Sequence, residues 1–597
     1  HRSGHLWRCA EPFRIGDQQS ARRGRESSRF PRPHRLKVLI ADPVRPGPIE
    51  SPGQRKGEQI RVYEAGTDVD EAAFWDATGK RIAYRNLWTS IPNLLCGFAV
   101  WMLWSTIIVR IQSLNDADPS LFAFPGADGQ PLRGNDYRGL LYLLPAVAGL
   151  AGATLRIPNS FIVAISGGRN AKALTTLLLI LPALGTGIAL QDPQVSFTTL
   201  IVLAALSGVG GGAFASSMSN ISFFFPKRMQ GLALGLNAGL GNLGVSVMQF
   251  MVPYVICFGL FGALGGEPYA SPAGSVWIQN AGLAWVPTLA VCALLAAGLM
   301  NNLPVHPCGP FPLAAARFLW LELLGFAGAA AGIVLMLQLQ LPELIEMFIV
   351  VLAAVVLTLL LMRFATPQAI RGNLRKQFGV FRNKHNWIMT WLYTMTFGSF
   401  IGYSAAFPKL ISDVFGYVRV DANGVLLADP QKLADAPNAL TYAFLGALVG
   451  SLVRPLGGWL SDRFGGARVT HWDTWVMIAS AIGVAWCVMK ARFSPEPGTW
   501  FLPFLLLFLL LFVTTGIGNG STFRMIPIIF PKEQAGPVLG WTSAIAAYGA
   551  FLIPTIFATQ IKAGTPEYAL YGFVVYYVSC LAVNWWYYAR RGAEIVC

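Results

Sequence analysis

The sequence predicts an all-α polytopic membrane protein with about fourteen transmembrane helices, and three observations support this fold class. Of the 597 residues, 54% are hydrophobic and 13% are charged, whereas soluble domains contain about 25% charged residues. Apolar runs of roughly 20 residues, the length that a helix needs to cross a bilayer, recur along the chain. Motifs of the first half of the chain also recur in the second half at a fixed spacing. The helices are therefore expected to form two related halves.

Residues 1–67 precede the apolar runs and differ from them in composition. Residues 1–61 contain fourteen basic and six acidic residues in a stretch rich in Pro, Arg and Ser. Such a segment cannot bury enough apolar surface to fold, so we expect a disordered basic tail. Because much of the net charge of +15 comes from this tail, the charge does not indicate nucleic-acid binding.

The first six-helix half is expected at 68–301, with spans near 87–110, 139–166, 173–190, 196–218, 231–258 and 280–301. The second half is expected at 386–597, with spans near 386–410, 440–460, 472–490, 498–524, 536–558 and 568–589. Residues 302–385 contain a further helix pair, near 318–340 and 345–364, which we interpret as a structural insertion. Within it, Glu322 is expected to lie near the membrane surface and to pair with Arg317.

The charges of the loops predict an orientation. Loops on one side of the predicted membrane carry Lys and Arg, such as Lys227 and Arg228, whereas those on the other side carry Asp and Glu, such as Asp116 and Asp435. Positively charged loops remain in the cytoplasm. Both termini are therefore expected to be cytoplasmic.

An internal repeat relates the two halves. The motif Phe-Pro-Lys at 225–227 recurs at 530–532, followed in each case by two glycines at the same spacing. Arg156 and Arg454 likewise each lie eleven residues before the first glycine of a Gly-Gly turn. Two six-helix halves related by an axis normal to the membrane are the layout of the major facilitator fold.

Arg156 and Arg454 are the first candidate substrate-binding residues. Each lies near the middle of its span, where a charge costs about 2.5–3.5 kcal/mol. Apart from Glu322, the spans carry no Asp or Glu at this depth, and we expect the acidic residues of the two halves to lie in loops or turns. Two unpaired guanidinium groups predict an anion site, and their planar forks of N–H donors suit a planar oxyanion.

A glycine-rich segment supplies further candidates. The span at 231–258 carries Gly231, Gly235, Gly239, Gly241 and Gly244. Glycines three or four residues apart allow another helix backbone to approach closely, so we predict tight helix packing along this face. Asn242 is a polar residue within the same apolar segment and is expected to face a cavity. No cluster of His, Cys, Asp or Glu has metal-ligand spacing, so neither a metal nor a cofactor is expected.

Several of these strings resemble the nitrate/nitrite porter family, the NarK-type branch of the major facilitator superfamily. The resemblance covers roughly 68–301 and 386–590, and it rests on Arg156-Ile-Pro-Asn-Ser-Phe, the glycine-rich string 208–244, residues 392–402, Arg454 with its Gly-Gly turn and residues 516–524. It implies that Arg156 and Arg454 hold the substrate, that Phe214 and Phe523 sandwich it, and that Tyr393 and Asn242 hydrogen-bond it. The inserted helix pair departs from the common twelve-helix form of this family. A second departure is Ala547, which occupies the position that the repeat assigns to a counterpart of Asn242.

The resemblance implies a secondary transporter of nitrate and nitrite, not an enzyme, in the bacterial cytoplasmic (inner) membrane. Two fixed cations in an empty cavity repel each other, and an anion between them relieves this repulsion. A loaded carrier should therefore return faster than an empty one, which favours nitrate/nitrite antiport. Proton-coupled nitrate symport and facilitated transport of another small planar organic anion are the alternatives. The expected partners are the two anions and the lipid bilayer, without nucleic acid, and the protein is expected to be a monomer.

Overall fold

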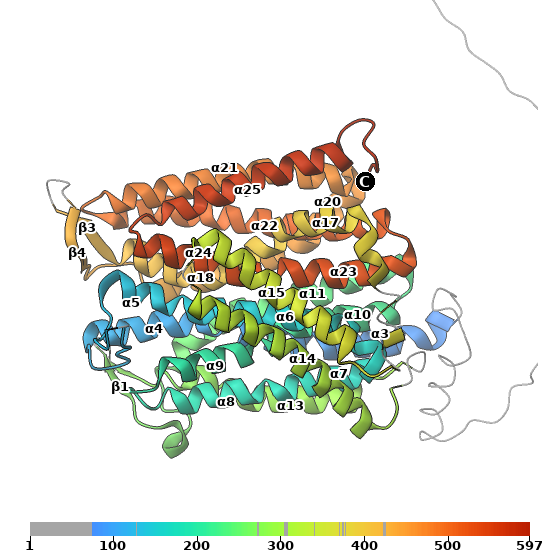
Figure 1. The fold of residues 1–597 in the computed structure, drawn as a ribbon, viewed down its shortest axis with the longest axis horizontal. Helices are drawn as coiled ribbons and strands as arrows, with labels where there is room; N and C mark the ends of the chain where they lie inside the picture. The colour runs from blue at the N-terminus through green and yellow to red at the C-terminus, as the bar shows by residue number, and fades with distance from the viewer. Residues whose placement is uncertain are drawn as a thin grey trace, which may run out of the picture. The chain divides into compact units, whose positions relative to one another are not determined.

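A computed structural model describes residues 74–597 apart from 127, 272–273, 304–307, 340, 369–370, 373–374, 376–377 and 422–425. The tail expected at 1–67 lies outside the described residues. The described chain is mostly helical (Figure 1), which confirms the predicted fold class. Two short antiparallel hairpins accompany the helices, one from β1 (Tyr269–Ser271) and β2 (Gly274–Val276), the other from β3 (Tyr417–Val420) and β4 (Leu426–Lys432).

The helices of the first half are η1 Trp75–Gly79, α3 Lys80–Trp101, α4 Trp104–Ala117, α5 Gly134–Leu141, α6 Leu143–Ser166, α7 Gly168–Leu178, α8 Ile180–Ala189, α9 Phe197–Ser207, α10 Val209–Phe224, α11 Lys227–Val255, η2 Gly262–Gly265, α12 Asn280–Leu283 and α13 Trp285–Leu299. The inserted pair consists of α14 Phe311–Gln338 and α15 Glu343–Phe364, and η3 Phe378–Arg382 follows it. Those of the second half are α17 Lys384–Tyr393, η4 Thr394–Gly398, α18 Ser399–Phe415, α19 Ala439–Leu452, α20 Arg454–Phe464, α21 Gly466–Arg492, η5 Pro497–Trp500, α22 Phe501–Ile529, α23 Lys532–Ala546, α24 Gly549–Lys562, α25 Glu567–Asn584 and η6 Trp585–Ala589.

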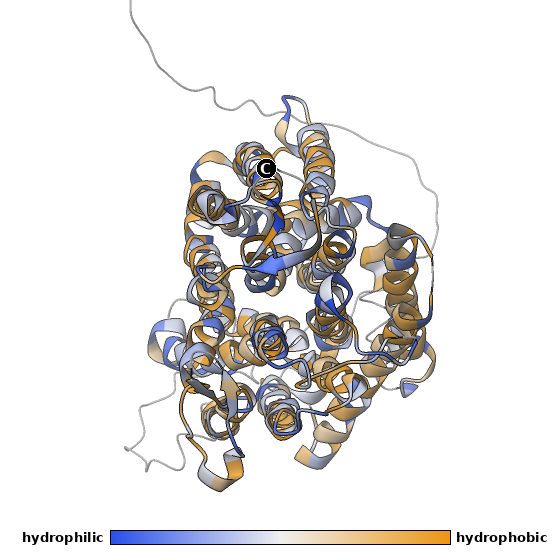
Figure 2. Cartoon of the chain, turned by 90° about the vertical axis from the view of Figure 1, so that its left-hand side faces the viewer, coloured by the Kyte–Doolittle hydropathy of each residue, from blue (hydrophilic) through white to orange (hydrophobic). Residues whose placement is uncertain are grey.

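Within the described residues, twelve helical segments are long and apolar enough to cross a membrane. Two of the expected spans are not among them, those at 231–258 and 386–410. Both are nevertheless helical, as α11 and as the run α17–η4–α18, and Gly, Asn and Gln reduce the mean hydropathy of α11. Figure 2 views the helices end-on and shows that most of them are predominantly hydrophobic, as expected of a multi-pass membrane protein.

The sequence repeat marks equivalent points of the two halves. α6 and α20, which carry Arg156 and Arg454, end at Gly167 and Gly465. These glycines have φ values of 82° and 88°, a backbone conformation that favours glycine. α11 and α23 likewise both begin at the lysine of the repeated Phe-Pro-Lys motif. The two candidate arginines therefore occupy corresponding positions, each eleven residues before a glycine turn.

The helices of the two halves meet along several pairs. α6 packs against α23 and α24, α11 against α19, and α4 against α18. The inserted helix α14 packs along α6 and against α15, and α15 also contacts α6 and α24 (Figure 1). The inserted pair thus lies directly against the helix that carries Arg156.

The glycines of α11 do not all serve the same packing contact. A Cβ atom at Gly244 would collide with the backbone oxygen of Leu95 on α3, and one at Gly241 would collide with the side chain of Leu94. At Gly239 a Cβ would make an ordinary contact with α19, 3.6 Å from the Ser451 oxygen, and at Gly235 nothing lies within 4 Å. The surroundings of Gly231 lie outside what the structure describes. Close approach of a second backbone therefore occurs at Gly244, not at Gly235 as the spacing suggested.

We predict that Gly244→Ala destabilises the protein by about 1–3 kcal/mol, the usual penalty of overpacking, because the new methyl group meets backbone that cannot move aside. Gly235→Ala is the matched control on the same helix. It should leave stability unchanged or raise it by up to about 1 kcal/mol, the helix-propensity difference between the two residues. Thermal unfolding of the detergent-purified variants measures both effects. Equal melting temperatures for the two variants would contradict the packing described for Gly244.

Candidate functional site

Arg156 lies near the centre of the fold, on α6, and its guanidinium group is fully buried. Its Nε atom donates a hydrogen bond to the carbonyl oxygen of Gly211 on α10 (2.8 Å), and Nη1 donates to the carbonyl oxygen of Ser543 on α23 (3.1 Å). Nη2 is buried and has no partner among the described residues. Arg156 therefore bridges the two halves and keeps one donor free for another acceptor.

Aromatic rings enclose the guanidinium group of Arg156. Its Cζ atom lies 4.7 Å from the ring centre of Phe214 and 4.8 Å from that of Phe397. The rings of Trp101 and Phe98 on α3 lie 5.2 and 6.0 Å away. The negative faces of such rings attract a cation without neutralising its charge. The charge of Arg156 is thus stabilised and retained.

Arg454 begins α20 and is also buried. Its Nη2 atom donates to the hydroxyl oxygen of Tyr393 (3.1 Å), and its Cζ atom lies 5.4 Å from the ring centre of Phe523. With the Asn242 amide oriented so that its nitrogen donates to the Ala238 carbonyl (3.3 Å), the amide oxygen accepts a hydrogen bond from Nη1 of Arg454 (3.0 Å). Asn242 belongs to the first half, so Arg454 also bridges the halves.

A row of rings connects the two arginines. Tyr393 stacks on Phe397 with ring centres 5.6 Å apart and planes 3° apart, and Phe397 stacks on Phe214 at 5.8 Å and 25°. Tyr393 also contacts Phe523, with ring centres 5.5 Å apart. The structure thus brings all six predicted side chains into one site. Phe214 contacts the guanidinium group of Arg156, and Phe523 contacts that of Arg454.

Phe397 is a member of this site that the sequence analysis missed. It lies in η4, a π-helical turn between α17 and α18, and helical irregularities of this kind are common at functional sites. Its ring follows that of Tyr393 by four residues, and this spacing is the signal that could have identified it. Phe98 and Trp101 were missed because an aromatic residue on an apolar helix reads as ordinary packing.

Neither arginine forms an ion pair within the described part of the chain. Their partners are carbonyl oxygens, a phenol, an amide and aromatic faces, all of them neutral. Two buried cations without a counter-ion produce a strong positive potential in a medium of low dielectric constant. The arrangement can therefore hold a small anion between the halves.

Two expectations about acidic residues are wrong. Glu322 is buried and accepts a hydrogen bond from Nδ2 of Asn159 on α6 (2.6 Å); it does not pair with Arg317. Asp413 and Asp473 lie inside helices α18 and α21 and are buried, not in loops or turns. Asp413 pairs with Lys409, one helical turn earlier. The sequence did not show that these residues are buried within helices. Asp413 and Asp473 lie near predicted helix ends, where an acidic residue is expected in a loop, and Glu322 lies in the inserted pair.

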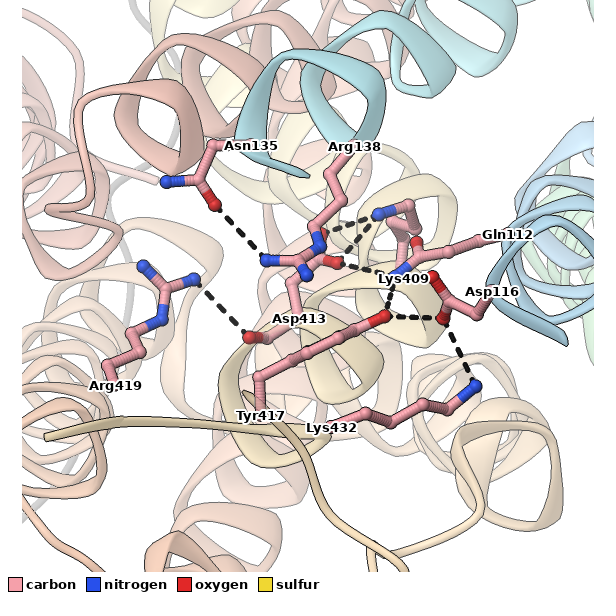
Figure 3. Close-up of polar contacts among 9 residues, drawn as sticks. All are labelled: Gln112, Asp116, Asn135, Arg138, Lys409, Asp413, Tyr417, Arg419 and Lys432. Carbon is pink, nitrogen blue, oxygen red and sulfur yellow. Dashed lines mark hydrogen bonds and ion pairs between the residues drawn. The ribbon is translucent and has the colours of Figure 1, made fainter. Parts of the chain in front are cut away.

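A second polar cluster joins the two halves at the end of the helices where the β3–β4 hairpin lies (Figure 3). We call it the inter-half cluster, and its members are Gln112, Asp116, Asn135, Arg138, Lys409, Asp413, Tyr417, Arg419 and Lys432. The first four belong to α4 and α5 of the first half, and the others belong to α18, β3 and β4 of the second half.

Tyr417 is the central residue of the inter-half cluster. Its hydroxyl accepts a hydrogen bond from Nε2 of Gln112 (2.8 Å) and donates one to Oδ2 of Asp116 (2.6 Å), while the guanidinium carbon of Arg138 lies 3.6 Å from its ring centre. Burial raises the pKa of the Tyr417 phenol above its ordinary value, so it remains a donor. Lys432 adds an ion pair to Asp116 at 3.1 Å.

Comparison with known proteins gives relatives across most of the chain, although no protein-family model matches it. The chain is 38% identical over 531 residues to the "probable nitrate/nitrite antiporter NarK2" of Thermus thermophilus, covering 88% of this chain and 96% of that protein. It is 34% identical over 549 residues to the "nitrate/nitrite transporter NarU" of Escherichia coli, covering 87% and 95%.

Solved structures resemble the fold at much lower identity. A crystal structure of a D-xylose–proton symporter matches with a TM-score of 0.54 and 14% identity, covering 86% of this chain and 98% of that one. The major facilitator superfamily proton:xylose symporter XylE matches with a TM-score of 0.51 and 14% identity, covering 87% and 98%. These matches show the major facilitator fold.

We predict that Phe397→Leu weakens anion binding about tenfold, equivalent to about 1.4 kcal/mol and within the range of a buried cation–π contact. The change removes the ring that contacts Arg156 and Tyr393 while retaining an apolar side chain. Phe407→Leu is the matched control, because Phe407 is equally buried on α18 but stacks on Phe508 of α22. Calorimetric titration with nitrate compares the two variants. Similar affinities would contradict a binding role for Phe397.

Proposed function

The chain belongs to the family of nitrate/nitrite transporters that includes NarK2 and NarU, and we propose that it exchanges nitrate for nitrite across a bacterial cytoplasmic membrane by alternating access. The observation that carries this proposal is the pair of buried arginines that connect the two halves of a major facilitator fold and have no carboxylate partner among the described residues. Relatives of 34–38% identity over most of the chain are named nitrate/nitrite antiporters or transporters. The protein is a transporter and not an enzyme.

The anion binds between Arg156 and Arg454 in this proposal. Nitrate and nitrite are planar, so ring faces can cover them while N–H donors reach the oxygens at their edges. Nη2 of Arg156 is the free donor, and Tyr393 and Asn242 hold Arg454 in place from opposite halves. Phe214 and Phe523 cover one arginine each.

The exchange mode follows from the retained charge. With two cations and no ion-paired carboxylate in the described part of the chain, the closed site is unfavourable unless an anion lies between the arginines. The barrier to rearrangement of the two halves is therefore lower with an anion bound. A carrier of this kind returns faster loaded than empty, and each nitrate that enters is exchanged for a nitrite that leaves.

The proposed orientation places the basic loops and both termini in the cytoplasm. The inter-half cluster then lies on the outer side. All six site residues belong to one chain, so a monomer is sufficient for transport.

Opening toward the outside must separate α4 and α5 from α18 and β3, and the contacts of Tyr417 with Gln112 and Asp116 must break. The inter-half cluster thus acts as the outer gate.

Proton-coupled nitrate symport is the second candidate, because two buried carboxyl groups lack an ion pair. One oxygen of Asp473 and one of Glu322 have no hydrogen-bond partner within the described residues. Such groups take up protons more readily than exposed ones. Transport assays distinguish this mechanism from exchange.

The test of exchange uses purified protein in vesicles that are loaded with nitrite or left without it, at equal pH on both sides. We expect labelled nitrate to enter nitrite-loaded vesicles much faster than nitrite-free ones. Arg156→Lys and Arg454→Lys should each reduce uptake roughly a hundredfold, because each loses two hydrogen bonds of a charged group worth about 1.5–3 kcal/mol apiece. Arg524→Lys is the control, since Arg524 is exposed and pairs with Asp462.

Uptake into nitrite-free vesicles that is driven by an inward proton gradient and abolished by a protonophore would overturn the exchange mode in favour of symport. Preferential uptake of a monocarboxylate over nitrate would overturn the substrate assignment. Normal uptake by either lysine variant, in protein that elutes as a single folded species, would contradict the site.

The gate gives a separate prediction. Tyr417→Phe removes the donor to Asp116 and the acceptor for Gln112, so we expect the outward-open population to rise about tenfold, which corresponds to about 1.4 kcal/mol. A cysteine introduced by Ser246→Cys, at a buried position of α11 that contacts Phe444 of α19, reports the opening in a background without native cysteines. Its labelling by an external thiol reagent should accelerate accordingly.

The matched control for the gate is Tyr568→Phe. Tyr568 lies at the same end of the helices but is exposed, and its replacement should not change the labelling rate. An unchanged rate in Tyr417→Phe as well would contradict the role of the inter-half cluster as a gate.

A further inference from the structure

The inserted helix pair contacts the helix that carries Arg156 at the level of the site. A Cβ atom at Gly325 of α14 would lie 2.8 Å from Leu155 and 3.0 Å from Pro158 of α6. Gly332 lies two turns further along α14 and faces Leu150, which is also on α6. Small residues at this spacing allow α14 to lie against α6. The inserted pair therefore packs against residues next to Arg156 on α6, although its sequence suggested a purely structural role.

Glu322 of α14 is the polar residue at this contact. Its side chain is 2% exposed; one oxygen accepts a hydrogen bond from Nδ2 of Asn159 (2.6 Å), and the other has no partner among the described residues. A carboxyl group enclosed in this way is costly to ionise unless a cation lies in contact with it. Its position is therefore suited to hold a proton.

Asn159 links Glu322 to the arginine site. It follows Arg156 by three residues on α6, and residues at this spacing are neighbours on a helix surface. Both side chains face α10: Arg156 donates to the carbonyl oxygen of Gly211, and Nδ2 of Asn159 lies 2.9 Å from the position of a Cβ at Gly212. The carboxyl group of Glu322 is thus hydrogen-bonded directly to Asn159, which is the neighbour of Arg156 on the surface of α6.

No charged group that the structure describes forms an ion pair with Glu322. The charged side chains described on the helices that pack closely against α14 are Arg156 on α6, Arg169 and Lys172 on α7, Glu346 and Arg363 on α15, and Arg317 on α14 itself. None of them forms an ion pair with Glu322. An ionised Glu322 would therefore act on the potential at Arg156 without local compensation.

We propose that Glu322 is a proton-binding site that is linked to anion binding at Arg156. This inference rests on the proposed function. When Glu322 is ionised, its negative charge opposes an anion at the arginines; when it is protonated, the full positive potential of the arginines is available. Anion affinity falls as pH rises through the titration of Glu322. By thermodynamic reciprocity, anion binding draws a proton onto the carboxyl group.

This linkage is compatible with exchange. Nitrate and nitrite each carry one negative charge and bind the same site, so the carboxyl group takes up a proton equally with either anion. One-for-one exchange then moves no net proton. The effect appears as a pH-dependent affinity and not as transport driven by a proton gradient.

The test measures nitrate binding to the purified full-length protein at about pH 6 and about pH 8.5, a range that spans the titration expected of a buried carboxyl group. Nitrate stays ionised throughout. We expect the wild-type Kd to rise about five- to tenfold between the two values, as for other coupled sites. Glu322→Gln should bind with the low-pH affinity at both values, because the amide can still accept from Asn159 but cannot ionise. Glu322→Asp retains a carboxyl group and should retain a pH dependence.

Glu346→Gln is the matched control, a carboxyl group of the same inserted pair on α15, and should behave as the wild type. A second readout is the proton taken up when nitrate is added to weakly buffered protein, which should be present in the wild type and absent in Glu322→Gln. A wild-type pH dependence in Glu322→Gln, or a pH-independent wild-type Kd, would overturn the proposal. Failure of the wild type to bind either nitrate or nitrite would instead overturn the proposed function on which it rests.

Discussion

The rest of the structure depends on the burial of two guanidinium cations that have no counter-ion among the residues described. A buried charge is costly unless polar groups replace water, and an ion pair would remove the positive potential that binds an anion. The structure uses neutral partners throughout: the carbonyl oxygens of Gly211 and Ser543 for Arg156, and Tyr393 and Asn242 for Arg454. Ring faces supply the remaining stabilisation. The glycine-rich α10 follows from this requirement, because a Cβ atom at Gly211 would collide with Trp101 and prevent the close packing of α3, α6 and α10.

The cost of a buried charge also explains how much the sequence could predict. Arg156 and Arg454 were identifiable because a charge in an apolar span costs free energy and is therefore usually functional. The repeat also placed them at matching depths. Phe397 was missed because an aromatic residue looks the same in a core and in a binding site; its spacing of four residues from Tyr393 was the available signal, and no sequence pattern predicts the π-helical turn. Glycine spacing identified a helix face but not its neighbour, so Gly244 packs closely while Gly235 does not. Glu322 was predicted to pair with Arg317. The sequence of a helix that is apolar on all sides does not show which face packs against α6, so the contact with Asn159 could not be predicted.

The two polar systems between the halves differ in kind, and this difference suits their positions. The central site has two cations and neutral partners, so it gains stability when an anion arrives. The inter-half cluster contains both signs of charge, with Lys409 and Asp413 paired at 2.7 Å and Lys432 paired with Asp116, so both of its carboxylates have a counter-ion within the protein. Opening at the cluster exposes its charges to water, which solvates them well. In the proposed mechanism, the contacts of the inter-half cluster therefore stabilise the state that is closed to the outside, and a bound anion reduces the repulsion between the arginines in that state.

The same electrostatic reasoning decides which buried carboxyl groups can influence transport. Asp413 is neutralised by Lys409, so a change at the arginine site has little effect on its charge. Asp473 lies close to Gly518 of α22, and no hydrogen bond described for it reaches a residue of the arginine site. Glu322 alone among these three is hydrogen-bonded to a residue on the helix of Arg156. A negative charge at that position weakens the binding of every monovalent anion equally, so it cannot select nitrate over nitrite. In the proposed mechanism, the inserted pair thus adjusts how strongly the site holds its anions, whereas the arginine forks and the rings determine which anions fit.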